Sequence, residues 1–379
     1  MRGLRRTGGD RAVEDQIGIT VASSDGLKWA GALHGMARDS LEVVGRMKQA
    51  QRDKGGTENR NTDRIKDRIR VGPLKETELQ EADRIFRLAF GTFIGLPDPS
   101  AFWGGRELFL PRWHAPHVTS FAAREDGRLI GSNMLTRWGS FAFFGPLTVL
   151  PEYWNRGVAQ ALLDATVKTF AKQGLKRTGL FTFPHSTKHV GLYQKFGYWP
   201  GYLTALMAYI PDGSRAAAGQ GVELSTLAKS EREAAIAACA RLTDRIDKGL
   251  DLSEEIRSVL RKKVGEVVLT YTRSAVDGFA ICLNGPGSEG GEKTCYIKFA
   301  AARGGAGAGE RFDALLDACD AFAVSRGASI EAGMNLARED AYRRMRAHGF
   351  KAFAQGVSMQ RPHQAGHNRP DVYVMDDWR

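Results

Sequence analysis

The pentapeptide ALLDA occurs twice in the 379-residue chain, at residues 161–165 and again at 314–318. The two copies lie 153 residues apart, and two similar segments, KFGY around Gly197 and AHGF around Gly349, lie 152 residues apart. The offsets agree within one residue, and the same order of elements surrounds both copies. This repetition indicates a duplicated unit, so we predict two tandem domains of about 145–160 residues each.

Hydrophobic periodicity predicts matching series of strands and helices in the two halves. In the first half, FAFFGPLTVL is predicted to be one strand, and the next helix spans roughly residues 156–173 and ends at Gly174. Another helix is predicted over 77–91, between Thr77 as N-cap and Gly91. A short helix after Ser186 is expected to stop at Gly197. We expect an α/β (α+β) fold in which each domain is a mixed central sheet flanked by helices.

Composition sets the expected boundaries. The segment QAQRDKGGTENRNTDRIKDR has almost no apolar side chains and cannot offset its ordering entropy. PDGSRAAAGQG has the Gly, Ala and Ser content of a linker. The predicted parts are a flexible basic extension (1–66), a first domain (67–210), a linker (211–221), a second domain (222–362) and a C-terminal tail (363–379).

The net charge of +11 is compatible with an anionic ligand, a nucleic acid or simple solubility. Residues 1–70 carry 15 Lys and Arg against 10 Asp and Glu, but no nucleic-acid motif accompanies them. No apolar run approaches the roughly 18 residues of a membrane span. The early apolar run IGITVA is too short and too late for a secretory signal, so we expect a cytoplasmic protein. The four cysteines have neither zinc-finger spacing nor a CxxC pair, so we expect reduced thiols and no metal site.

Small residues mark the point where the strand ending in Val149 gives way to a helix, in the sequence NRGVA at 155–159. The first turn of a helix has backbone N–H groups without intrahelical partners and carries the positive end of the helix dipole. Phosphate binds at such a position when the backbone can be approached closely. On composition alone, tight packing is the simpler explanation of Gly157 and Ala159.

The combination of GPLTVLPEYWNRGVAQALLDA with HVGLYQKFGY about 30 residues later resembles the GNAT (Gcn5-related) N-acetyltransferase family. That family's signature is a strand ending L-x-V-x-P, then Q/R-x-x-G-x-G/A opening a helix, then a helix ending L-Y-x-x-x-G-F. The resemblance covers residues 68 to about 210 well and continues more faintly to about 362. It implies two tandem GNAT-like domains.

The resemblance also implies acetyl-CoA as co-substrate and assigns its contacts. Strand residues Leu147, Thr148 and Val149 would bond the pantetheine arm, and the amides of Asn155, Arg156, Gly157, Val158 and Ala159 would hold the pyrophosphate. Ser186 either contacts the cofactor or only caps its helix. One position departs from the family: Trp154 stands where Gln or Arg is usual, so the backbone amides and Arg156 are expected to carry more of the phosphate binding.

Family chemistry is direct attack of an amine on the thioester. Tyr193 matches the tyrosine that protonates the leaving thiolate, although a packed ring with a bonded hydroxyl is the alternative. A base must take the amine's proton, because a free amine has a pKa near 10. His185 and His189 are candidates, and each is equally a cap or packing residue. Trp113, His114 and His117 are weaker candidates for lining the acceptor side.

When the two repeats are aligned on ALLDA, Glu310 replaces Gly157 and Phe312 replaces Ala159. Met345 falls at the position of Tyr193 when they are aligned on Gly349. A carboxylate would repel phosphate, so we expect a catalytic first domain and a degenerate second one, unless residues 304–309 form a phosphate loop in a shifted register.

The resemblance therefore implies an N-acetyltransferase that acts on a primary amine of a small molecule or peptide. A non-catalytic CoA-sensing or partner-binding protein is the alternative, and nucleic-acid binding through residues 1–70 is a third hypothesis. Neither the acceptor nor the oligomeric state follows from these residues.

Overall fold

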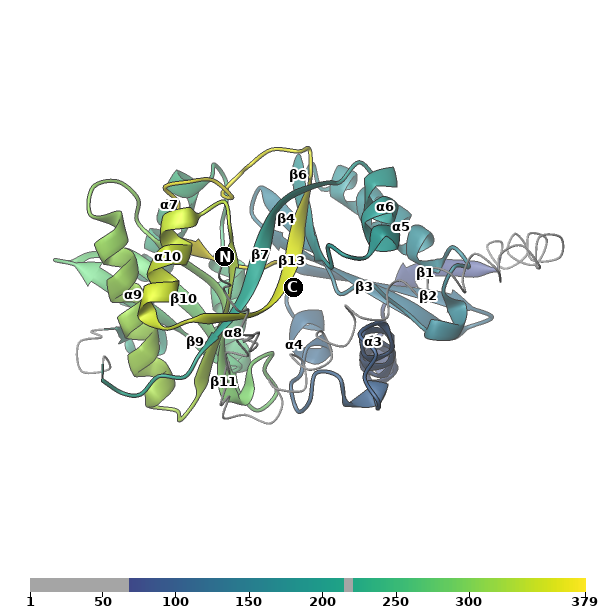
Figure 1. Cartoon of the computed structure of the whole chain (residues 1–379), viewed down its shortest axis with the longest axis horizontal. Coiled ribbons are helices and arrows are strands. Elements are labelled where there is room, and N and C mark those ends of the chain that lie inside the picture. The colour runs from purple at the N-terminus through teal and green to yellow at the C-terminus, as the bar shows by residue number, and fades with distance from the viewer. Residues whose placement is uncertain (1–67, 215–220) are drawn as a thin grey trace, which may run out of the picture.

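The computed structural model describes residues 68–214 and 221–379, so the predicted extension over 1–66 lies outside the described residues. One mixed sheet of 14 strands runs through both halves, with helices packed against it (Figure 1). No helix in the described ranges is long and apolar enough to cross a membrane. The four cysteines are buried and form no disulfide.

The elements follow the predicted order closely. The first half contains β1 (Ile69–Pro73), α3 (Leu79–Phe93), α4 (Phe109–Trp113), β2 (Val118–Glu125), β3 (Arg128–Trp138), β4 (Phe141–Phe144), β5 (Thr148–Val149), α5 (Val158–Lys172), β6 (Arg177–Thr182), α6 (Thr187–Lys195) and β7 (Trp199–Tyr209). The second contains β8 (Val222–Glu223), α7 (Lys229–Ile246), α8 (Ser253–Lys262), β9 (Gly265–Thr272), β10 (Ala275–Gly285), β11 (Gly291–Ala302), α9 (Ala308–Val324), β12 (Ser329–Asn335), α10 (Glu339–His348), β13 (Lys351–Arg361) and β14 (Val374–Met375).

The last strands of the two halves are exchanged. In the sheet order β4-β6-β13-β7-β12-β11, strand β13 of the second half lies between β6 and β7 of the first. Strand β7 in turn pairs with β12 of the second half, from Thr204 opposite Asn335 to Tyr209 opposite Ile330. Figure 1 shows β7 and β13 crossing the centre of the molecule side by side. The two halves therefore share one continuous hydrogen-bonded sheet.

Two predicted elements differ in the structure. FAFFGPLTVL is two strands, because Gly145 adopts a φ of 147° before the cis peptide to Pro146, and Pro146 has no N–H to continue the ladder. Helix α3 runs past Gly91 to Phe93 and is preceded by Glu78 rather than Thr77. Gly91 is small because a Cβ there would lie 2.2 Å from the carbonyl oxygen of Pro99.

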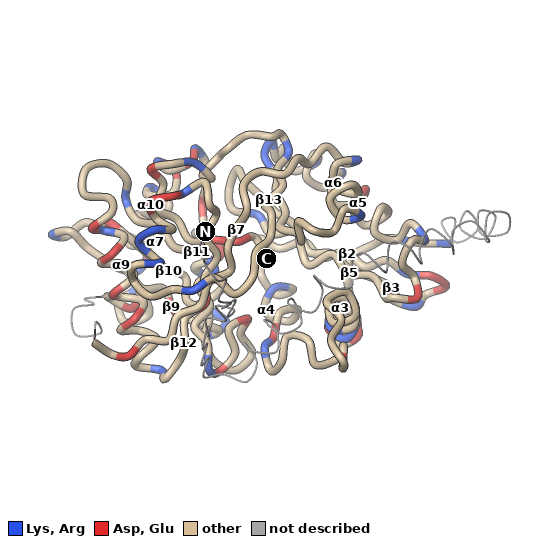
Figure 2. Tube along the Cα trace, viewed as in Figure 1, with Lys and Arg blue, Asp and Glu red and all other residues tan. Residues whose placement is uncertain are grey.

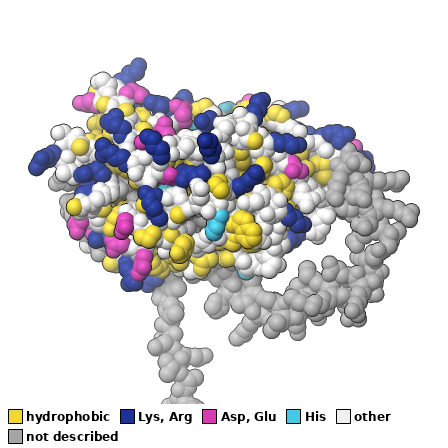
Figure 3. All heavy atoms as spheres, turned by 90° about the horizontal axis from the view of Figure 1, so that it is seen from above, with side chains coloured by type: hydrophobic (Ala, Val, Ile, Leu, Met, Phe, Trp, Pro, Cys, Tyr) yellow, Lys and Arg dark blue, Asp and Glu magenta, His cyan; other side chains and the backbone are white. Residues whose placement is uncertain are grey.

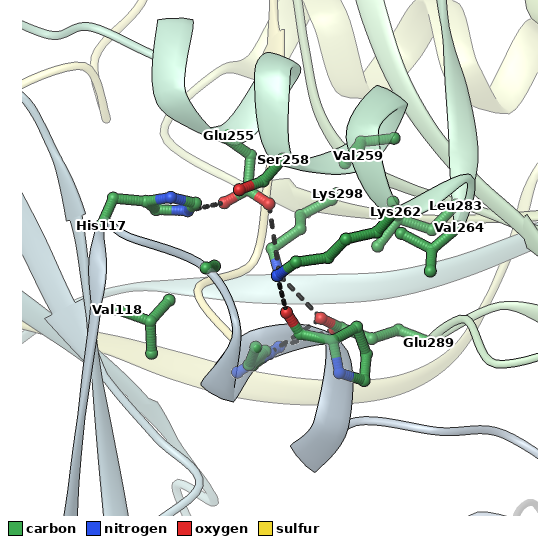
Figure 4. Close-up of a pocket in the computed structure, with 13 residues that line it drawn as sticks. His117, Val118, Glu255, Ser258, Val259, Lys262, Val264, Leu283, Glu289 and Lys298 are labelled. Carbon is green, nitrogen blue, oxygen red and sulfur yellow. Dashed lines mark hydrogen bonds and ion pairs between the residues drawn. The ribbon is translucent and has the colours of Figure 1, made fainter.

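Buried ion pairs join the two halves. Arg112 of α4 forms a bidentate pair with Glu289, and Lys298 of β11 bonds the same carboxylate at 2.7 Å. Glu255 of α8 accepts from Trp138 Nε1 at 3.0 Å and lies 2.9 Å from His117 Nε2. All of these side chains except Trp138 line a cavity of about 20 Å³, in which His117 and Glu255 meet from opposite halves (Figure 4).

The charges elsewhere are mixed. Lys and Arg are interspersed with Asp and Glu along both halves (Figure 2).

Burial by itself would raise the pKa of Glu289, but Arg112 and Lys298 outweigh it and lower that pKa to about 2. The carboxylate is therefore held ionised by these two cations.

We expect Glu289→Gln to lower the free energy of unfolding at pH 7 by about 3–5 kcal/mol, because it leaves the buried Arg112 without its carboxylate and Lys298 with only the longer ion pair to Glu255 at 3.8 Å. The pKa of Glu289 is about 2 in the fold against an ordinary 4.5, so its contribution is complete above about pH 4.5 and is lost as the pH falls toward 2. Urea titrations at pH 7 and pH 3 measure both effects. Glu292→Gln, at an exposed position near the start of β11 and three residues from Glu289, is the control. Equal stability of the two variants at pH 7 would contradict the expectation.

Candidate functional site

Strands β4 and β6 are paired only at their beginnings. Their parallel ladder runs from Phe141 opposite Arg177 to Phe143 opposite Gly179. Beyond Gly145 the chain continues as β5, which pairs with β3, while Leu180–Thr182 of β6 pair with β13. We call the divergence between β5 and this end of β6 the first fork.

The backbone of β5 presents hydrogen-bonding groups to the first fork. Leu150 N donates to Ile130 O at 2.9 Å, and Gly131 lies opposite Val149. Because bonded and non-bonded pairs alternate along an antiparallel ladder, the N–H and C=O of Val149 point away from β3, as do those of Leu147. Thr148 instead faces β3, and its hydroxyl lies 3.0 Å from that of Ser132. Of the three predicted strand residues, two therefore turn their backbone groups to the fork.

Trp154 completes one edge of β5. Its indole N–H donates to the carbonyl oxygen of Val149 at 2.8 Å, so one of the two fork-facing groups of that residue is bonded. The Val149 N–H is the group left directed into the fork. Trp154 thus has an internal partner, which accounts for an indole at a position where the family usually has Gln or Arg.

The start of α5 forms a concave array of backbone N–H groups. Asn155 and Gly157 have positive φ values of 65° and 84°, and no side chain caps the helix. The first helical bond joins Ala161 N to Gly157 O at 3.0 Å, so the preceding amides of Val158, Ala159 and Gln160 have no intrahelical partner. Alternating positive φ values and free amides are typical of anion-binding nests.

Two cations flank this array. The guanidinium of Arg156 lies 5.2 Å from the ring centre of Tyr153. Lys188, from the first turn of α6, has its Nζ 5.9 Å from the ring centre of Trp154, and burial lowers its pKa. Sequence reasoning missed Lys188, since only the packing of α6 beside the α5 start brings it there. The face seen from above in Figure 3 shows basic side chains more prominently than acidic ones.

Helix α6 supplies the remaining predicted residues. Ser186 caps the helix by accepting from His189 N at 3.4 Å. The ring of Tyr193 is buried 5.9 Å from that of Phe144, and its hydroxyl bonds Thr182 at the end of β6. Burial raises the pKa of Tyr193 well above its ordinary value, more than the bond to Thr182 lowers it. The hydroxyl is therefore a protonated donor beside the strand that bounds the fork.

The two candidate bases lie against α3. The rings of His185 and His189 are 6.0 and 4.8 Å from that of Phe93. Burial, with smaller contributions from Lys188 and His185, lowers the pKa of His189 to about 4. The imidazole is neutral near pH 7, but a group of so low a pKa removes a proton from an ammonium only weakly.

The weaker acceptor-side candidates have other partners. Trp113 donates its indole N–H to Leu74 O at 2.9 Å, and the half-exposed His114 lies 3.8 Å from Glu76. His117 pairs with Glu255 in the cavity of Figure 4. Nothing in this geometry directs the three side chains to the first fork.

The second half corrects the predicted register. Helix α9 begins at Ala308 after Gly307, whose φ is 74°, so Gly307 and Gly309 occupy the positions of Gly157 and Ala159. Glu310 is exposed in the first turn, and Phe312 is fully buried in the core. The prediction that these two side chains replace the small residues was wrong. Three extra residues separate the start of α9 from ALLDA, and the pentapeptide fixes the register only within the helix.

The start of α9 is nevertheless obstructed. A Cβ on Gly309 would lie 2.1 Å from Nη2 of Arg344, so this guanidinium packs directly against the first turn. Arg344 is itself paired with Asp313 and Asp340. Met345, at the position equivalent to Tyr193, is fully buried and has no hydroxyl to donate.

Comparison with known proteins supports the fold. Residues 83–198 match the model of the acetyltransferase (GNAT) family. The chain is similar to a candidate acetyltransferase from Pyrococcus horikoshii, with 14% identity over 81% of this chain and 93% of that one and a TM-score of 0.58. It is also similar to the fungal multi-domain GH3 β-N-acetylglucosaminidase that contains a GCN5-related glucosamine N-acetyltransferase region, with 14% identity, 77% and 38% coverage and a TM-score of 0.54.

A tandem GNAT protein from the clavulanic acid biosynthesis pathway matches with 13% identity, 77% and 98% coverage and a TM-score of 0.49. No curated protein sequence matches the chain significantly. Residues 83–198 thus carry the GNAT acetyltransferase pattern, and the mixed α/β fold is of the GNAT type.

We expect Lys188→Met to weaken binding of coenzyme A by about 1–2 kcal/mol, roughly 5- to 30-fold in Kd, because a charge-assisted contact to phosphate is lost. Calorimetric titration at two salt concentrations measures the change, and the salt dependence should fall with it. Lys172→Met removes an exposed charge from the last turn of α5 and serves as control. Equal affinities for the two variants would exclude Lys188 from the phosphate site.

Proposed function

We propose that the chain is an acetyl-CoA-dependent N-acetyltransferase with one working site, at the first fork. The observation that carries the proposal is the unpaired edge of β5 leading directly to the uncapped start of α5. An extended arm that contains amides could hydrogen-bond along the β5 edge as a neighbouring strand would. A pyrophosphate at the end of that arm would then accept from the free N–H groups at the start of α5.

Each part of the co-substrate has a matching group. The Val149 N–H and the backbone of Leu147 would bond the pantetheine arm, as a strand bonds its neighbour. The amides of residues 155–159, with Arg156 and Lys188, would hold the pyrophosphate. Ser186 already caps α6 through its hydroxyl, so we assign it no direct contact with the cofactor.

The reaction is attack of a neutral amine on the thioester carbonyl. The C–N bond forms, the C–S bond breaks, and the electron pair leaves on sulfur. Tyr193 would donate its phenolic proton to that sulfur, since burial keeps the hydroxyl protonated. The amine must lose a proton, and no Asp or Glu lies on β4 or β5. A water molecule next to His185 or His189 is the base we favour.

We further propose that the second half is degenerate, because Arg344 covers the start of α9 and Met345 offers no acid. The acceptor is a primary amine of a small molecule or peptide, and the cytoplasm remains our expected location. The buried pair of Arg112 with Glu289 fixes α4 to the second half, so the second half supports the first site.

We expect Tyr193→Phe to lower kcat about 100-fold or more, with little change in the affinity for acetyl-CoA, because only the departing thiolate needs the proton. Tyr198→Phe is a matched control. Its hydroxyl is also buried, lies 2.9 Å from that of Thr178, and belongs to the same aromatic cluster. A similar loss in both variants would assign Tyr193 to packing alone.

The activity itself is tested by following thiol release from acetyl-CoA across a panel of polyamines, amino sugars, aminoglycosides and peptide N-termini. We expect release with at least one acceptor and formation of its N-acetyl product by mass spectrometry. Binding of coenzyme A without release across the panel would favour the alternative, a CoA-sensing or partner-binding protein. If coenzyme A did not bind with a Kd below about 1 mM, both the acetyltransferase and the CoA-sensing hypotheses would be wrong.

A further inference from the structure

The second half contains a fork equivalent to the first. The parallel ladder of β11 and β12 ends with Ile297 opposite Ala332, and β11 continues to Ala302. Ala301 and Ala302 lie 153 residues after Thr148 and Val149. Arg303 N donates to Asp277 O, so Ala301 turns its backbone groups to β10 as Thr148 turns its own to β3, whereas Ala300 and Ala302 turn theirs to the gap between β11 and β12. We call this divergence between β11 and β12 the second fork.

Unlike the first, the second fork is filled by the chain itself. Strand β14 pairs antiparallel with β11, with Met375 opposite Ala300 and Val374 opposite Ala301. Ala302 N donates to Tyr373 O at 2.9 Å. In the first half, no strand of the described residues pairs with the edge of β5 that faces the fork. In the second half, the equivalent edge of β11 is already hydrogen-bonded to the extended backbone of β14.

Buried charges hold this segment in place. Arg338, whose side chain is fully buried, donates to Val374 O at 2.7 Å, to Asn368 Oδ1 at 2.6 Å and to Asp376 Oδ1 at 2.7 Å. The other oxygen of Asp376 lies 2.7 Å from His367 Nε2 and accepts from Trp378 Nε1 at 2.8 Å. Because these buried polar side chains all have hydrogen-bond partners, the C-terminal segment is held in one defined position.

Glycines make room where the segment crosses the sheet. A Cβ on Gly333 of β12 would lie 2.2 Å from Cβ of Asp377. A Cβ on Gly179 of β6 would lie 2.8 Å from Cζ3 of Trp378. Gly179 belongs to the first half and Gly333 to the second. Each half therefore has a glycine where a larger side chain would collide with the C-terminal segment.

The segment ends beside the first fork. The ring of Trp378 packs 4.9 Å from that of Phe141 of β4. Arg112 donates to Arg379 O at 2.6 Å and, through its other nitrogen, to Gly145 O at 3.1 Å. Gly145 directly follows the end of β4, where the first fork opens, and the C-terminus lies at the centre of the molecule (Figure 1).

We propose that the segment Tyr373–Arg379 occupies the second fork in the place of an acyl-CoA arm and, anchored there, forms part of the acceptor-side wall of the first fork. This rests on the proposed function of the first fork. The chain then takes one acyl-CoA, and the second half positions Trp378 and Arg379 for the first site. They are positioning residues, acting through Gly179, Arg112 and Gly145.

The variant Gly333→Ala tests this from the second half, because its methyl group displaces Asp377 without touching the first fork. We expect KM for the acceptor to rise about 10-fold with less than a twofold change in Kd for acetyl-CoA. Gly304→Ala, where a Cβ meets nothing within 4 Å, is the control. Identical kinetics of the two folded variants would overturn the proposal.

Hydrogen exchange provides a readout independent of activity. The amide of Ala302, bonded to Tyr373 O, should be protected in the wild-type protein and exchange at least 10-fold faster in Gly333→Ala. Rapid exchange in the wild type would overturn the proposal even if no acceptor were found. A wild type that is protected but releases no thiol would instead count against the proposed function alone.

A cross-link covers the case in which Gly333→Ala does not fold. Ala301 and Val374 are direct cross-strand partners, so Ala301→Cys with Val374→Cys can be joined by oxidation. We expect turnover to persist in the oxidised protein, since the segment stays in the second fork throughout the reaction. Loss of turnover on oxidation, restored by a reductant, would show that the segment must leave and would overturn the proposal.

Discussion

Backbone hydrogen-bonding groups inside a protein must find partners, and this constraint governs both forks of the sheet. In each half a pair of parallel strands separates partway along, which leaves a row of peptide groups on β5 or β11 without a neighbouring strand. The second half satisfies that row with β14. The first half satisfies one carbonyl with Trp154 and leaves an N–H directed into the fork. The two halves therefore differ in whether the chain supplies its own strand for these peptide groups.

Much of the first half could be predicted from sequence. The spacing of apolar residues located α5 and α6, and the Ser186 cap and the positive φ of Gly197 followed from local chemistry. Local periodicity does not report which strand lies beside which, so the exchange of β7 and β13 was not foreseen. The break at Gly145 was hidden because the apolar run continues through it. Gly91 was interpreted as a helix stop, whereas its reason is the approach of Pro99, a tertiary contact.

The residues of the candidate site also divide into those that local sequence predicts and those that only the packing reveals. The start of α5 and the position of Tyr193 follow from motifs that are contiguous in the chain. Lys188 and the segment Tyr373–Arg379 come from elsewhere and could be found only from the packing. The comparison of the repeats failed at the start of α9 because the alignment was carried back from the shared pentapeptide to the helix start. Helix α9 begins three residues further from the pentapeptide than α5 does, so the aligned residues do not correspond there. Because small residues occur at both helix starts, Gly157 and Ala159 do not by themselves distinguish a binding site from tight packing. The two halves differ instead at the strand edge, which β14 covers on β11 but no strand in the described part of the chain covers on β5.

The exchange of β7 and β13 also determines when the chain can finish folding. Strand β7 is made some 120 residues before β12 and 140 before β13, the two strands that flank it. Until both have left the ribosome, neither edge of β7 is paired and β6 lacks its neighbour on the side opposite β4. The first half is therefore an incomplete sheet during synthesis, and its free edges are open to incorrect pairing. The arrangement is what fusing the two chains of a strand-exchanged dimer would produce. Fusion keeps the two missing strands on one molecule, and it replaces an encounter between chains by the closure of a loop.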